Sequence, residues 1–138
     1  MGELVVTELN GSVPGAEWIE LYNASGATID LTGVRVTLTK LDGSSTETFV
    51  VQQGDLPALD AGAYVAVPVP DELPGGAGVD VITCGRLVDR MIYRNLPADG
   101  SLAFDGDVDP PDAVANDDEP SWCPEMDTPG ERNPPCPE

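Results

Sequence analysis

Acidic side chains dominate the residues of this sequence that could do chemistry. The chain has 25 aspartate and glutamate residues against six lysine and arginine residues, a formal net charge of −19, and it contains no histidine. The commonest general base and the commonest imidazole metal ligand are therefore both missing. Ser-His-Asp, Cys-His and HExxH sites are excluded, and the phosphate-binding motifs GxGxxG and GxxxxGK[ST] do not occur.

Three glutamates near the start of the chain come closest to a catalytic carboxylate pair. Glu17 and Glu20 are three positions apart in a segment predicted to be a strand, so their side chains would point to opposite faces of the sheet. Paired acid and base catalysis needs both groups on one face. We interpret Glu8 and Glu20 as acceptors of hydrogen bonds from loop amides or from an arginine, and we predict no catalytic residue and no cofactor.

An aspartate-rich run at residues 105–109 begins like a calcium-binding loop. An EF-hand loop requires glycine at its sixth position and glutamate at its twelfth, whereas counting from Asp105 gives Pro110 and Asn116. We therefore expect a solvated acidic loop and predict no metal ligand. A Ca²⁺ site of another kind stays open as the alternative.

The three cysteines favour one disulfide and one free thiol. A bridge between Cys123 and Cys136 would close a loop of about 13 residues and contribute about 3 kcal/mol, and we predict this pair. Cys84 precedes Gly85 at an expected turn, and without histidine no base is present to activate it as a nucleophile. The rival pairing of Cys84 with Cys123 stays open.

Short segments of alternating polarity, separated by Gly, Pro, Asn and Asp, predict the structural elements that carry these residues. This pattern is typical of a β-sandwich or barrel, and no stretch has helical periodicity over three turns. Pro68 has no N–H to donate to a β-ladder, so either its strand lies at a sheet edge or the proline lies at the end of the strand. The predicted strands are residues 4–9, 18–23, 34–41, 46–51, 63–69, 79–83, 87–93 and 101–104.

The composition changes after Phe104. Residues 105–138 hold eight of the 14 prolines and a large excess of acidic side chains. Proline withholds donors from a β-ladder and like charges repel, so this segment is expected to form little regular structure. We predict an acidic loop followed by a C-terminal strap that Trp122 anchors, within one domain that spans residues 3–138.

Residues 17–23 read EWIELYN, which matches the signature of the lamin-tail domain letter for letter. Residues 4–10 resemble the opening strand of that family and residues 29–33 its turn into the next strand, and weaker similarities follow in order at residues 59–64, 87–93 and 128–133. The chain departs from the pattern at Val34, where an aromatic residue is usual. The resemblance implies an all-β, immunoglobulin-like β-sandwich of the kind found in nuclear lamins and in many secreted bacterial proteins, and it carries over no catalytic residue.

Charge and family resemblance together set the expected function. A chain this acidic would repel nucleic acid and an anionic membrane surface. The sequence contains no run of 18 apolar residues, so we do not expect it to insert into a membrane. We expect a non-catalytic interaction or structural module of an exported or cell-surface bacterial protein, bound to another protein or to a cell-surface component. The alternative is an accessory domain that binds Ca²⁺ or a glycan beside a secreted hydrolase.

Overall fold

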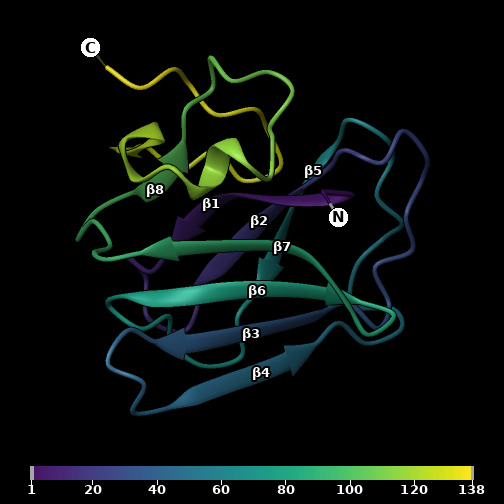
Figure 1. Ribbon diagram of the computed structural model, residues 1–138, viewed down its shortest axis with the longest axis horizontal. Helices are drawn as coiled ribbons and strands as arrows, with labels where there is room; N and C mark the ends of the chain where they lie inside the picture. The colour runs from purple at the N-terminus through teal and green to yellow at the C-terminus, as the bar shows by residue number, and fades with distance from the viewer. Residues whose placement is uncertain (1, 138) are drawn as a thin grey trace.

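The alternating segments fold into two antiparallel β-sheets in the computed structural model, which describes residues 2–137 (Figure 1). The prediction of an all-β, sandwich-like fold is confirmed, and every predicted strand is present within two residues of its expected ends. The five-stranded sheet has the order β5 (Tyr64–Pro68), β2 (Trp18–Asn23), β1 (Leu4–Asn10), β8 (Ser101–Phe104) and β9 (Trp122–Glu125). The four-stranded sheet has the order β4 (Thr46–Val50), β3 (Arg35–Lys40), β6 (Ala77–Thr83) and β7 (Arg86–Tyr93).

The hydrophobic core lies between the two sheets. Branched aliphatic side chains of β1 and β2, such as Leu9 and Ile19, pack in one cluster with Val36 of β3 and Val81 of β6. The fold contains two short 3₁₀ turns, η1 (Ala115–Asp117) and η2 (Glu119–Ser121). No helix among residues 2–137 is long and apolar enough to cross a membrane.

The C-terminal segment, residues 105–137, contains more regular structure than its composition predicts. The expectation of little regular structure is wrong for β9, which pairs with β8 despite Pro124. β9 is the last strand of its sheet, and an edge strand tolerates a residue that lacks a ladder donor. Pro68 likewise ends β5, the opposite edge strand, as predicted.

The C-terminal segment packs on the side of the five-stranded sheet that faces away from the core (Figure 1). The indole N–H of Trp122 donates to the carbonyl oxygen of Asn116 at 2.8 Å, and its ring centroid lies 5.5 Å from that of Phe104. Trp122 itself packs against the core cluster, whereas Thr128 and Gly130 bond to Glu8 and Glu20 on the other face of the sheet, and all seven residues of β1 are buried. The predicted range of the domain ends at residue 138, which lies outside the described residues.

Candidate functional site

Two buried glutamates lie side by side on the covered face of the five-stranded sheet. Glu8 of β1 and Glu20 of β2 are register partners, and both are fully inaccessible to solvent. A β-bulge between Val6 and Glu8 places them there, because Val6 and Leu9 both join the core cluster although they are three positions apart. The extra residue reverses the alternation, so Glu8 turns away from the core.

Both carboxyl groups hold the C-terminal turn, residues 127–133. The amide N–H of Thr128 donates to Oε2 of Glu8 at 3.0 Å, and Oγ1 of Thr128 lies 2.9 Å from Oε1 of Glu8. The amide N–H of Gly130 donates to Oε2 of Glu20 at 2.9 Å, and the Thr7 hydroxyl donates to Oε1 of Glu20 at 2.8 Å. We call Glu8, Glu20 and these three partners the carboxylate clamp.

Asn133 fixes the far end of the same turn. Its Nδ2 donates to the carbonyl oxygens of Thr7 at 2.6 Å and Phe104 at 3.0 Å, and the side chain is buried. Its Oδ1 lies 3.1 Å from the hydroxyl of Thr128. One buried amide therefore joins β1, the end of β8 and the C-terminal turn.

The electrostatics of the carboxylate clamp favour protonated carboxyl groups. Burial raises the pKa of Glu20 to about 8; the charge of Glu8 adds to this shift, while the hydrogen bonds from Thr7 and from the turn oppose it. Burial also raises the pKa of Glu8. Neither glutamate takes part in an ion pair within residues 2–137, where the four ion pairs use other acids.

Asp89 of β7 is a third buried carboxyl group, and it also accepts hydrogen bonds from the chain itself. Its Oδ2 receives the amide N–H of Val6 at 2.8 Å and Nδ2 of Asn116 at 2.7 Å, while its Oδ1 receives the amide N–H of Arg90 at 2.8 Å. Burial raises the pKa of Asp89 to about 6. The side chain connects the four-stranded sheet to β1 and η1.

The prediction that Glu8 and Glu20 accept hydrogen bonds from loop amides is confirmed. Those amides belong to Thr128 and Gly130, and no arginine bonds to either glutamate in the described part of the chain, residues 2–137. Glu17 lies apart from this pair, and its Oε1 accepts the amide N–H of Leu73 at 2.9 Å. Glu17 and Glu20 thus have separate partners, in keeping with the expectation that they face different ways.

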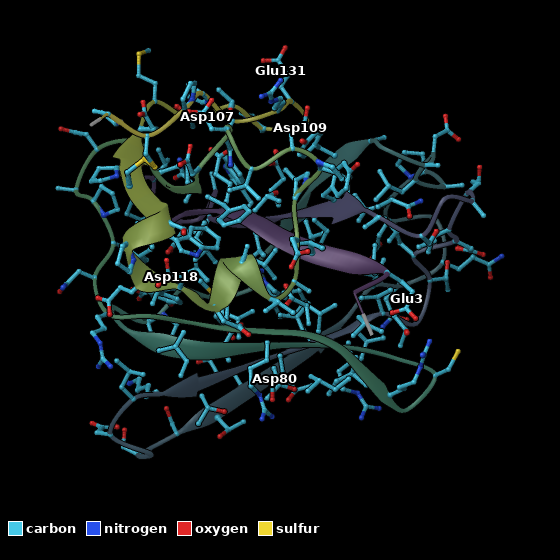
Figure 2. The ribbon with its side chains drawn as sticks, turned by 45° about the horizontal axis from the view of Figure 1, so that its top comes forward. Glu3, Asp80, Asp107, Asp109, Asp118 and Glu131 are labelled. Carbon is cyan, nitrogen blue, oxygen red and sulfur yellow. A yellow bond between two sulfur atoms is a disulfide. The ribbon has the colours of Figure 1, made fainter. Side chains whose placement is uncertain are left out.

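The aspartates that begin like a calcium loop are not brought together. Oδ1 of Asp105 accepts the amide N–H groups of Asp107 and Cys136, each at 3.0 Å. Asp109 pairs with Arg132 at 3.5 Å. Figure 2 shows Asp107 and Asp109 on the outer side of the C-terminal segment. Among residues 2–137, no group of three or more His, Cys, Asp or Glu side chains is placed to hold a metal ion.

The structure joins Cys123 and Cys136 in a disulfide, with their Cα atoms 5.8 Å apart. This is the pair that the sequence favoured over Cys84 with Cys123. Cys84 is an exposed free thiol in the turn between β6 and β7. Cys84 and Gly85 both have positive φ, 50° and 74°, as a type I′ hairpin turn requires.

An open groove of about 300 Å³ lies between the end of β7 and the β8–β9 edge. Apolar side chains, including Ile92, Leu102 and Trp122, line most of it. Arg94 and Glu119 also line the groove and form an ion pair at 3.3 Å. Trp122 gives this groove an aromatic lining, but none of the buried carboxyl groups is among its lining residues.

Comparisons of this chain with protein families, with curated proteins and with solved structures found no match. The functional interpretation therefore depends on the site itself. Sequence reasoning missed Asp89, Asn116 and Asn133 as buried hydrogen-bonding side chains. Only the resemblance at residues 128–133 marked the C-terminal turn, because its partners on β1 and β2 lie more than 100 positions away in sequence.

Proposed function

We propose that this chain is a non-catalytic interaction or structural module of an exported or cell-surface protein, an immunoglobulin-like sandwich of the lamin-tail kind closed by a C-terminal strap. One observation carries the proposal. The buried carboxyl groups, Glu8, Glu17, Glu20 and Asp89, all accept hydrogen bonds from backbone amides of this chain. Shifted pKa values often mark catalytic groups, but structural networks shift them too.

The disulfide supports the exported setting, because such bonds persist in oxidising compartments. The free sheet edges support binding through side chains rather than through strand addition. Pro68 and Pro124 interrupt the two edges of the five-stranded sheet, and Glu47 of β4 pairs in register with the core residue Leu38, so a charge lies on the inner face at a third edge. These features discourage pairing with a foreign strand.

Deletion of residues 3–137 from the full-length protein in its own organism tests the proposal. We expect the protein to leave the cell-surface fraction while any enzymatic turnover of the remaining chain is unchanged. Replacement by an unrelated sandwich domain of similar size is the matched control. If the unrelated domain restored localisation, this domain would act as a spacer. If it did not, this domain would bind a specific partner. If the deletion abolished enzymatic turnover while localisation stayed normal, a non-catalytic role would be contradicted.

A second candidate, an accessory domain that binds a glycan, is favoured by the groove beside Trp122. Its apolar lining and its Arg94–Glu119 pair combine an aromatic surface with polar groups, the usual make-up of a small-ligand site. Retention on immobilised polysaccharides, compared between the native chain and Ile92→Asp, tests this candidate. Val13→Asp is the control, because Val13 is similarly exposed, 55% against 52%, and is not among the residues that line the groove. Equal retention of both variants would exclude the groove.

A further inference from the structure

The hydroxyl group of Thr128 lies between two acceptors but has only one proton. Its Oγ1 is 2.9 Å from Oε1 of Glu8 and 3.1 Å from Oδ1 of Asn133. A hydroxyl donates one hydrogen bond and accepts others. If Glu8 were ionised, only one of these two contacts would contain a proton.

The orientation of Asn133 decides which contact needs another proton. Its Nδ2 faces two buried carbonyl oxygens, those of Thr7 and Phe104, which require a donor. The Oδ1 atom therefore faces Thr128 and can only accept. The Thr128 hydroxyl satisfies it, and the remaining contact is then completed by a proton on Oε1 of Glu8. This gives a chain of donors from Glu8 to Thr128 to Asn133.

We propose that Glu8 is a neutral carboxylic acid and that Glu8 and Glu20 form a proton-dependent latch, which holds residues 127–133 on β1 and β2 while the pair retains a proton and releases them when both groups ionise. The register of the two strands is the reason for release. Like charges directly opposite each other on neighbouring strands repel, and burial removes the water that would screen them.

Within residues 2–137, the groups around the latch do not supply a compensating positive charge. Across the sheet lie Glu20 on β2, Tyr64 on β5 and the neutral Ser101 on β8, and the turn contributes the acids Asp127 and Glu131. The nearby cation of the turn is Arg132.

The guanidinium group of Arg132 is already engaged elsewhere. It donates to the carbonyl oxygen of Gly106 and pairs with Asp109. Burial raises the pKa of both clamp glutamates, which agrees with a retained proton.

The disulfide limits how far the released turn can move. Cys123 and Cys136 lie on either side of residues 127–133, and Cys123 belongs to β9. Opening would therefore expose Glu8 and Glu20 without detaching the C-terminal end of the chain. The latch is a hinged flap over the outer face of β1 and β2.

A pH titration of the oxidised protein by NMR, from pH 5 to pH 9, tests the latch. We expect the side-chain carboxyl ¹³C signal of Glu8 to report ionisation with a midpoint above the ordinary glutamate pKa of 4.5. The amide signals of Thr128 and Gly130 should move at the same midpoint. Between the ordinary glutamate pKa of 4.5 and that midpoint, amide exchange protection in the turn, corrected for the intrinsic rate, should fall by up to about tenfold per pH unit for each proton lost on opening, and it should level off above the midpoint.

The variant Glu8→Gln separates the latch from general alkaline loosening. Its Nε2 would donate to the Thr128 hydroxyl as the acid does, so only the proton on Glu20 stays linked to opening, and protection of the turn should fall with pH less steeply than in the wild type, by at most about tenfold per pH unit. Glu131→Gln is the matched control, because it removes an exposed charge from the same turn and should keep the wild-type response.

Two results would overturn the inference. One is a wild-type protein in which Glu8 and Glu20 are both ionised at pH 5.5 while the turn stays docked. The NMR titration of the wild type alone gives this result, so it does not depend on a variant that folds. The other is a well-folded Glu8→Gln protein that loses protection as the wild type does.

Discussion

The two sheets share one core but differ on their other faces. In the four-stranded sheet, burial alternates along the strands: Val36 and Leu38 of β3 are buried, while Arg35 and Thr39 are exposed. In the five-stranded sheet, every residue of β1 is buried, including Glu8. The acidic, proline-rich segment that composition alone marks as poorly structured covers this second face. Its acidity lies toward solvent, as Figure 2 shows for Asp107, Asp109 and Glu131.

This difference explains where the buried polar chemistry lies. A sheet face that meets water satisfies its polar side chains with solvent, whereas a covered face must satisfy them within the protein. Glu8, Glu20 and Asn133 together connect the covering segment to β1 and β2. The covered face is thus held by specific hydrogen bonds, and it should respond to pH and to substitution in ways that the open face does not.

The largest expected effect is a loss of stability as pH rises. The pKa of Glu20 is raised from 4.5 to about 8 and that of Asp89 from 3.8 to about 6, so the folded state holds protons that the unfolded state has released. Their contribution is complete below the unfolded pKa values and is lost as pH rises through the folded ones.

The free energy of unfolding, measured by urea denaturation, should fall between pH 5 and pH 9 by an amount on the order of a few kcal/mol. Asp80→Asn, on the open face, should leave this slope unchanged. If the free energy of unfolding stayed constant or rose between pH 5 and pH 9, the covered face would not differ from the open face in its response to pH.

Loss of the disulfide comes next. The double variant Cys123→Ser and Cys136→Ser should lower the free energy of unfolding by about 3 kcal/mol, because the bridge restricts the unfolded chain. The C-terminal turn should nevertheless stay docked, since its hydrogen bonds to Glu8 and Glu20 do not involve sulfur. Amide exchange at Thr128 and Gly130 checks this second point, and rapid exchange there would show that the bridge also holds the turn.

Asn133→Ala should cost about 2 kcal/mol, because it leaves the carbonyl oxygens of Thr7 and Phe104 buried without donors. Thermal unfolding of the purified variant measures the loss. Asn95→Ala is the control, because Asn95 is exposed and should tolerate truncation. Equal effects of the two substitutions would mean that the covered face has no special dependence on this amide.

The smallest effect is expected on the open face. Arg90 forms an ion pair with Asp80 across β6 and β7 at 2.6 Å, with 60% of the Arg90 side chain exposed. Exposed pairs contribute about 1 kcal/mol or less, so Arg90→Gln should shift the urea midpoint only slightly, and high salt should reduce the difference further. A loss as large as that of Asn133→Ala would show that the open face is not simply solvated.

Local patterns in the sequence are enough to predict the strands and their turns. Alternating apolar residues identify β3, and the Cys84-Gly85 pair identifies the hairpin between β6 and β7, because period-two burial and positive φ are properties of a few neighbouring residues. The choice of Cys123 and Cys136 also followed from local spacing. These features need no knowledge of distant parts of the chain.

The identity of the amides that the buried acids meet, and the existence of β9, depend on the tertiary structure. Glu8 meets Thr128 across 120 positions and Glu20 meets Gly130 across 110, and a bulge in β1 turns Glu8 toward them. A local pattern that reads as an alternating strand contains no information on what covers its outer face. The covering segment forms β9 because β8 offers it an open edge, and that contact exists only in the folded chain.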